Sequence, residues 1–157
     1  MHAEQITIRP AEGGDVEALS RLVVELGYEA SLEGTQSRLA RVTEAPGHRV
    51  LVAVTQAPQV VGWVHVFGAP RVESDGFAEL GGLVVAAEDR GRGIGTQLVE
   101  AAEAWALRNG FDIVRIRSRV ERGASHGFFE NRGFSAVKTQ RVYEKLLKEP
   151  ESKNSEE

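Results

Sequence analysis

Three glycines and two arginines occupy the six-residue run Arg90-Gly91-Arg92-Gly93-Ile94-Gly95, which constrains the fold more than any other part of the chain. A β-prone run, Leu80 to Val85, precedes it, and a segment with helical periodicity follows. Glycines let the backbone turn so tightly that several N–H groups converge, and the positive end of a helix dipole strengthens their attraction for anions. The run therefore predicts a strand, an anion-binding loop and a helix, with Arg90 and Arg92 supplying charge for a pyrophosphate.

The spacing of these glycines excludes two common nucleotide-binding motifs. A dinucleotide fingerprint needs Gly-x-Gly-x-x-Gly, but the sixth position is Thr96 counted from Gly91 and Leu98 counted from Gly93. A P-loop is excluded because no Gly-Lys-Ser or Gly-Lys-Thr occurs. These mismatches disfavour a nucleotide-binding oxidoreductase. The alternative to an anion-binding loop is a glycine-rich turn with a purely structural role, which only starts a helix.

The remaining patterns predict alternating strands and helices. Pro10 is expected to close the first strand, Asp15 to cap the first helix and Gly110 to end the third. The hydrophobic periodicity predicts strands at 6–9, 50–54, 60–67, 77–85 and 112–117, helices at 16–26, 33–42, 94–108 and 121–132, and an extended run at 136–147.

The composition is typical of one globular domain. A chain of 157 residues can bury roughly 70% of its unfolded surface around a single core. We expect this domain to span residues 1–147 and the polar residues 148–157 to form a disordered tail. Trp63 and Trp105 are expected in the core.

Charge and cysteine content restrict partners and chemistry. The formal net charge of -4 gives no basic field for nucleic acid, and the absence of cysteine excludes disulfides, thiolate metal sites and a cysteine nucleophile. The first residues lack the charged segment followed by an apolar segment that is typical of a signal peptide. No stretch reaches the roughly 20 apolar residues of a membrane helix. We therefore expect no membrane association and a cytoplasmic location.

Several segments in this order resemble the GNAT superfamily of N-acetyltransferases. The run from Arg90 to Gly95 satisfies the family's Gln/Arg-x-x-Gly-x-Gly/Ala signature. Ile8-Arg9-Pro10 followed by Asp15 is similar to the family's opening, and Leu83-Val84-Val85 to its fourth-strand bulge. The segment from His126 to Phe134 resembles His-x-Phe-Tyr-Glu-x-x-Gly-Phe. The resemblance implies an α/β fold with a mixed sheet of six or seven strands, antiparallel at its start and parallel at the crossover, with helices on both faces.

The resemblance also implies acetyl-coenzyme A as co-substrate. Backbone groups of Leu83 and Val85 would run beside its pantetheine arm like an added strand, with an amide near Leu83 holding the thioester oxygen. No metal is expected, because His2, His48 and His65 lack metal-ligand spacing. The implied cofactor-binding residues are Leu83, Val84, Val85, Arg90, Gly91, Arg92, Gly93, Ile94, Gly95, Thr96, Arg122, Ser125 and Phe129.

Catalytic groups follow from the same resemblance. Attack on a thioester requires a neutral amine, and Glu79 is the candidate general base because its strand is similar to one that carries a catalytic glutamate in the histone-acetylating branch. Phe129 stands where relatives have a tyrosine that protonates the departing thiolate, and phenylalanine has no proton to donate. Ser125 and Tyr143 are the alternative acids. A thiolate is also a good leaving group unaided.

The predicted activity is direct acetyl transfer from acetyl-coenzyme A to a primary amine. The acceptor is a small molecule, which Glu29 could hold if it is cationic, or a peptide. A homodimer is one assembly we expect. The alternative, which Phe129 makes plausible, is a non-catalytic acetyl-coenzyme A sensor or partner-binding module.

Overall fold

The computed structural model describes residues 5–118, 120 and 123–148. These residues divide into a unit that ends at Arg117 and a second unit that begins at Ser118. Arg122 and residues 149–157 of the predicted tail lie outside the described residues. The elements are β1 (Thr7–Pro10), α1 (Val16–Glu25), α2 (Leu32–Glu44), β2 (His48–Val54), β3 (Val60–Ala69), β4 (Phe77–Val85), α3 (Ile94–Arg108), β5 (Val114–Ile116) and α4 (Gly123–Glu130), with short 3-10 helices η1 (Gly13–Asp15) and η2 (Ala87–Asp89).

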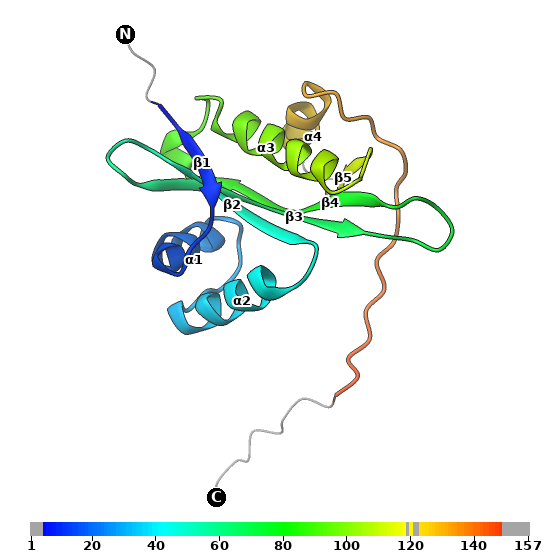
Figure 1. Cartoon of the computed structure of the whole chain (residues 1–157), viewed down its shortest axis with the longest axis horizontal. Coiled ribbons are helices and arrows are strands. Elements are labelled where there is room, and N and C mark those ends of the chain that lie inside the picture. The colour runs from blue at the N-terminus through cyan, green and yellow to red at the C-terminus, as the bar shows by residue number, and fades with distance from the viewer. Residues whose placement is uncertain (1–4, 119, 121–122, 149–157) are drawn as a thin grey trace, which may run out of the picture. The chain divides into compact units, whose positions relative to one another are not determined.

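The first unit is built on a mixed sheet with strand order β1-β2-β3-β4-β5. The first three pairings are antiparallel, and β5 joins β4 in parallel after the α3 crossover. Helices α1 and α2 cover one face of this sheet and α3 covers the other (Figure 1). The predicted α/β architecture with helices on both faces is therefore confirmed.

The predicted number of strands is wrong. The described residues form five strands rather than six or seven, and the run 136–147 that was expected to be extended forms no strand. Its apolar side chains stay exposed, Val142 by 86% and Tyr143 by 85%. A strand is stabilised by side chains packed on a half-buried surface, and this segment buries none of them.

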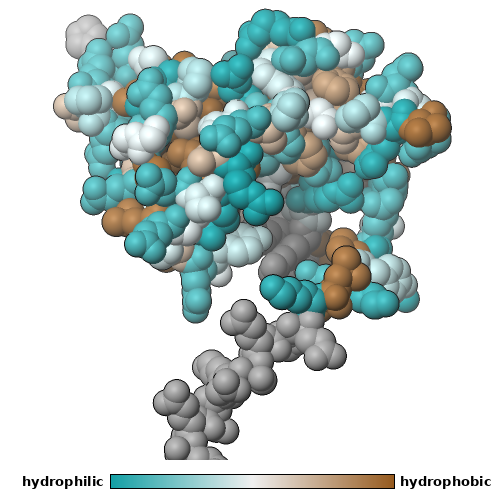
Figure 2. Space-filling view, turned by 60° about the horizontal axis from the view of Figure 1, so that its bottom comes forward, coloured by the Kyte–Doolittle hydropathy of each residue, from teal (hydrophilic) through white to brown (hydrophobic). Residues whose placement is uncertain are grey.

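The core lies between the sheet and the helices of the first unit. On α3 the predicted apolar stripe is buried, including Leu98, Ala102 and Trp105. On the opposite face, Leu19 and Leu22 of α1 pack with Val52 of β2. Figure 2, which brings the α1 and α2 side forward, shows a surface dominated by hydrophilic residues with separate apolar ones. Among the described residues no helix is long and apolar enough to cross a membrane.

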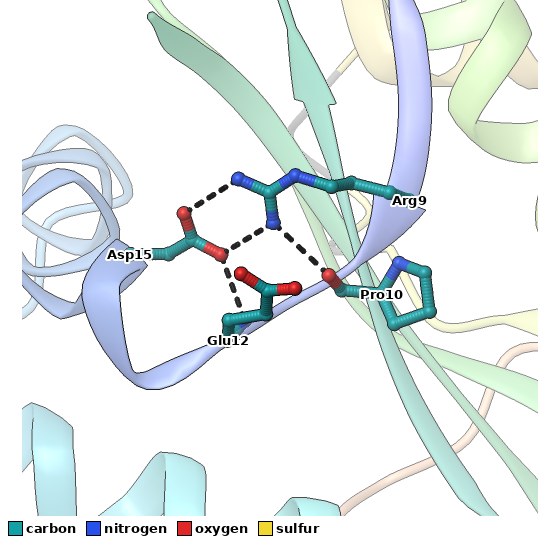
Figure 3. A network of polar contacts seen from close by, with 4 residues as sticks. All are labelled: Arg9, Pro10, Glu12 and Asp15. Atoms are coloured by element: carbon teal, nitrogen blue, oxygen red, sulfur yellow. Dashed lines mark hydrogen bonds and ion pairs between the residues drawn. The ribbon is translucent and has the colours of Figure 1, made fainter.

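Asp15 ties β1 to the start of α1. Its carboxylate accepts two hydrogen bonds from the Arg9 guanidinium, at 2.8 and 2.9 Å, and one from the backbone N–H of Glu12 at 2.7 Å (Figure 3). Asp15 occupies the N-cap position of α1, but its side chain caps no N–H of that helix, so the predicted role is wrong. The Asp15 carboxylate binds Arg9 rather than the helix N–H groups, because a bidentate, charge-assisted pair is stronger than a single capping hydrogen bond.

We expect Asp15→Ala to lower the free energy of unfolding by about 2–3 kcal/mol, because it leaves Arg9 without its carboxylate partner. The Asp15 side chain is only 7% exposed. Hydrogen bonding to Arg9 lowers the pKa of Asp15 below its ordinary 3.8, so this stabilisation is present above that pH and is lost as the pH falls below it. Urea denaturation measures the change. Glu17→Ala, an exposed carboxylate on α1, is the control and should change stability by less than about 0.5 kcal/mol.

The second unit contains α4 and the residues that follow it. Phe129 contacts Phe128 and Phe134 edge to face, with ring centroids 5.2 and 5.7 Å apart. The Arg132 guanidinium lies 3.9 Å from the centre of the Phe128 ring. Gly133 follows the helix with φ +88°, a conformation that suits glycine, and this agrees with the predicted helix end.

Candidate active site

The glycine loop, residues 90–95, leads from the end of β4 into α3. Gly91 and Gly93 both have left-handed backbones, with φ +80° and +79°, and Gly93 is the N-cap of α3. A Cβ atom at either glycine would meet no atom within 4 Å, so their exposed side is open. The first bond of the helix runs from the Gln97 N–H to the Gly93 carbonyl. The N–H groups of Ile94 and Gly95 precede it and have no intrahelical partner. This geometry suits a phosphate anion.

The two arginines of the glycine loop are held beside it. The Arg90 Nε donates to the Val85 carbonyl at 3.3 Å, and Arg92 pairs with Asp89 of η2 at 3.3 Å. Both arginines are exposed. Exposed ion pairs contribute little and exchange readily, so a pyrophosphate could compete for both guanidinium groups.

Among the described residues, no strand pairs with the edge of β4 that leads to the glycine loop, and this edge is therefore called open. Pairing of β4 with β5 ends at Leu80 and Ile116. Since the Ala86 N–H donates to Val61 of β3, alternation along the strand turns the N–H groups of Leu83 and Val85 away from β3. The edge that was predicted to receive an extended ligand therefore has backbone donors directed outward.

The β-bulge of β4 is not at Leu83-Val84-Val85, where the resemblance placed it. His65 pairs with Gly82 and Val66 pairs with Leu80, so Gly81 is the extra residue. Gly81 fits there because a Cβ atom would come within 2.9 Å of the His65 Nδ1. A larger residue at this position would displace the histidine ring.

Glu79 lies on the face of the sheet covered by α1 and α2, opposite Phe67 of β3. Its carboxylate is 15% exposed and pairs with Arg117 at 2.8 Å. The predicted base is therefore held in place by one exposed cation. An ionised carboxylate has two oxygens that can accept further hydrogen bonds, including one from an amine or water.

Sequence reasoning missed a stack of aromatic rings on the same face. His48 Nδ1 and His65 Nε2 are 2.9 Å apart, and the Phe67 ring lies 5.1 Å from His48 and 5.3 Å from His65. The two histidines had been considered only as metal ligands. Alternation along β2 and β3, which puts both on one face, is the signal that could have found the stack. Among the described residues no three His, Cys, Asp or Glu side chains gather as metal ligands would.

Burial and the neighbouring His48 lower the pKa of His65 from 6.5 to about 4, and the negative charge of Glu79 opposes this shift. The imidazole is consequently neutral at physiological pH. A neutral imidazole can accept a hydrogen bond from an approaching amine.

The unfolding free energy is expected to fall as the pH is lowered from about 6.5 to about 4. In that window the unfolded chain binds a proton at His65 and the folded chain does not. Because the ring is half-buried, we expect a loss of about 1–2 kcal/mol. Denaturation at stepwise pH measures it, and His65→Gln should flatten that part of the curve. An equal slope in the variant would mean that other groups cause the loss.

A pocket of about 170 Å³ opens on this face between the α1–α2 pair and strands β2 and β3. Trp63, predicted as a core residue, lines it, and the buried indole Nε1 has no hydrogen-bond partner among the described residues. Exposed Arg38 of α2 also lines it. The full lining is Leu19, Val23, Thr35, Arg38, Leu39, Val42, Val50, Trp63 and His65.

Other predicted site residues lie in the second unit, in an exposed loop or outside the described residues. Ser125 and Phe129 are half-buried in the second unit, and Arg122 lies outside the described residues. Tyr143 and Glu29 are exposed, and Glu29 does not line the pocket.

Comparisons with known proteins agree with this geometry. Residues 17–134 match the model of the Acetyltransferase (GNAT) family. An aminoglycoside N(6')-acetyltransferase type 1 from Klebsiella aerogenes is 28% identical over 146 residues, covering 89% of this chain and 96% of that protein. An uncharacterized N-acetyltransferase, YobR, from Bacillus subtilis is 35% identical over 63 residues, covering 40% of this chain and 26% of that protein.

Solved structures share the fold. The aminoglycoside N-acetyltransferase AAC(6')-Iy, solved with coenzyme A, superposes with a TM-score of 0.82 at 18% identity, covering 92% of this chain and 97% of that chain. AAC(6')-Ih from Acinetobacter baumannii gives a TM-score of 0.81 at 19% identity, covering 92% of this chain and all of that one.

Proposed function

Because this chain belongs to the GNAT family of acetyltransferases, we propose that it transfers the acetyl group of acetyl-coenzyme A directly to the primary amine of a small molecule. The observation that carries the proposal is the glycine loop, which opens α3 directly beside the open edge of β4. Relatives named for acetylating aminoglycosides, one of them solved with coenzyme A, support both the co-substrate and a small-molecule amine as acceptor.

The residues present fit coenzyme A. Left-handed Gly91 and Gly93 leave open space where a pyrophosphate would approach the N–H groups of Ile94 and Gly95. Arg90 and Arg92 would exchange their present partners for phosphate oxygens. The Leu83 and Val85 N–H groups would hold the pantetheine arm, with the Leu83 amide as the donor to the thioester oxygen. Bound acetyl-coenzyme A supplies the activated acetyl group.

The acceptor's amine would reach the thioester from the face that carries Glu79 and His65. Glu79 would remove a proton from the ammonium, directly or through water, and Arg117 would keep the carboxylate in place. His65, neutral and next to the bulge at Gly81, would accept a hydrogen bond from the amine and hold it in line for attack. A dedicated acid is unnecessary, since solvent can protonate a thiolate of pKa near 8.5.

Release of coenzyme A thiol in the presence of acetyl-coenzyme A and a panel of amines tests the proposal. Turnover with any member supports it. Binding of acetyl-coenzyme A without turnover on any amine would favour the sensor instead. A cytoplasmic location, a homodimer, a peptide acceptor, cofactor contacts by Thr96 and the α4 residues, and a single domain over residues 1–147 stay predictions.

A further inference from the structure

The pocket between α1, α2, β2 and β3 has a lining that excludes one kind of acceptor. Most of its residues are apolar, and none of them is an aspartate or glutamate. A polycationic ligand such as an aminoglycoside would bury ammonium groups there without a carboxylate partner, which is costly. Its volume of about 170 Å³ is also below the roughly 300 Å³ at which drug-sized pockets begin.

The polar groups of the pocket are suited to an anionic ligand. Arg38 is its only charged lining residue, and among the described residues this guanidinium has no hydrogen bond or ion pair. It lies over the first turn of α2, about where a Cβ atom on Gly34 would come within 3.1 Å of Nη1. Both the guanidinium and the helix N-terminus favour negative charge at that point. Glu33, the acidic residue of that turn, does not line the pocket.

Trp63 also lines the pocket. Its indole N–H is buried and has no hydrogen-bond partner among the described residues. The ring also reaches β4, where a Cβ atom on Gly82 would come within 2.7 Å of it. Trp63 and His65 thus connect the pocket with the bulge, where the proposed transfer occurs.

We propose that the pocket binds the acceptor and that the acceptor is a small amine with an apolar side chain and a carboxylate, as in an apolar α-amino acid. The carboxylate would pair with Arg38, the apolar side chain would lie among Leu19, Val23 and Leu39, and the amine would point toward His65 and Glu79. This assignment rests on the proposed acetyl transfer and replaces the cationic acceptor that the sequence suggested.

Matched pairs of amines test the assignment. Leucine is compared with 3-methylbutylamine, and phenylalanine with 2-phenylethylamine, so that each pair differs only in the carboxylate; kanamycin represents polycationic acceptors. In the parent, kcat/KM is expected to be highest for a carboxylated member. Arg38→Gln should lower kcat/KM for that amine by about 10- to 100-fold while its carboxylate-free partner changes by less than about twofold. The two amines of a pair have different pKa values, but this difference is the same for parent and variant. The ratio of their kcat/KM values can therefore be compared between the two proteins.

Arg41→Gln is the control, because Arg41 is exposed on the same helix and does not line the pocket. It should leave both amines of a pair unchanged. A parent that prefers kanamycin or the carboxylate-free amines, or an Arg38→Gln variant that affects both members of a pair equally, would overturn the assignment while leaving the acetyltransferase function in place.

Direct binding separates this inference from the proposed function. Calorimetry of leucine, phenylalanine and their carboxylate-free partners in the presence of coenzyme A measures affinity without turnover. Tighter binding of the carboxylated amine, lost in Arg38→Gln, supports the assigned ligand class even if no acetylation occurs, in which case only the proposed function fails. Equal binding of both members of every pair contradicts the ligand class.

Discussion

Gly93→Val is expected to abolish the stabilisation that acetyl-coenzyme A confers on the parent. At 100 times its dissociation constant a ligand adds about 2.7 kcal/mol to the free energy of unfolding. A valine side chain would fill the open space beside the helix N-terminus and keep the pyrophosphate from its N–H groups. A 100-fold loss of affinity would reduce the gain to about 0.4 kcal/mol at the same ligand concentration. Thermal or urea denaturation with and without acetyl-coenzyme A measures the difference.

Gly110→Val is the matched control for backbone strain. Gly110 follows the other end of α3, has φ +85°, and also has open space around its Cβ direction. Both variants force a left-handed backbone on valine and should lose stability by roughly 1–2 kcal/mol without ligand. Only the Gly93 variant should lose the response to acetyl-coenzyme A. A normal response in Gly93→Val would mean that the glycine loop does not bind the pyrophosphate.

Glu79→Gln is expected to reduce kcat by about 100-fold or more while the affinity for acetyl-coenzyme A is retained. The amide keeps the shape of the side chain but cannot take a proton from the ammonium. The effect should be largest near neutral pH, because an alkylammonium with a pKa near 10.4 is then almost entirely protonated. Initial rates between pH 6 and 10 with a good acceptor measure it.

The substitution also removes the ion pair with Arg117, and Arg117→Gln separates the two effects. It breaks the same 2.8 Å contact but leaves the carboxylate in place. If Glu79 is the base, Arg117→Gln should reduce the rate much less than Glu79→Gln. Equal losses would instead assign Glu79 a purely structural role, and a Glu79→Gln enzyme with a normal rate would leave water or His65 as the proton acceptor.

Local sequence signals predicted the strand, loop and helix around residues 80–108. The glycines at 91 and 93 permit left-handed backbones, and the apolar stripe of α3 repeats with the period of a helix. The β2–β3 hairpin followed from two β-prone runs separated by a short loop. In each case the relevant interactions join residues close together in the chain, so their spacing carries the information.

Predictions that depended on contacts between different elements were less successful. Asp15 suits a helix cap in sequence, but in the folded chain Arg9 of β1 competes for the same carboxylate. The apolar residues at 136–147 suit a strand, but in the described residues they bury no side chain. A local preference of about 1 kcal/mol is overridden when the folded chain provides a stronger interaction, as at Asp15, or no surface on which a strand could pack, as at residues 136–147.

The sequence by itself determined the family, the glycine loop and the order of the elements of the first unit. The tertiary structure decided which side chains meet: the bulge at Gly81, the His48–His65 contact, and the joining of Arg38 and Trp63 in one pocket. His48 and His65 are 17 residues apart, and only the register of β2 against β3 brings the His48 Nδ1 to 2.9 Å from the His65 Nε2. Strand register and helix packing depend on the whole core, because shifting a strand by one residue moves every side chain to the other face.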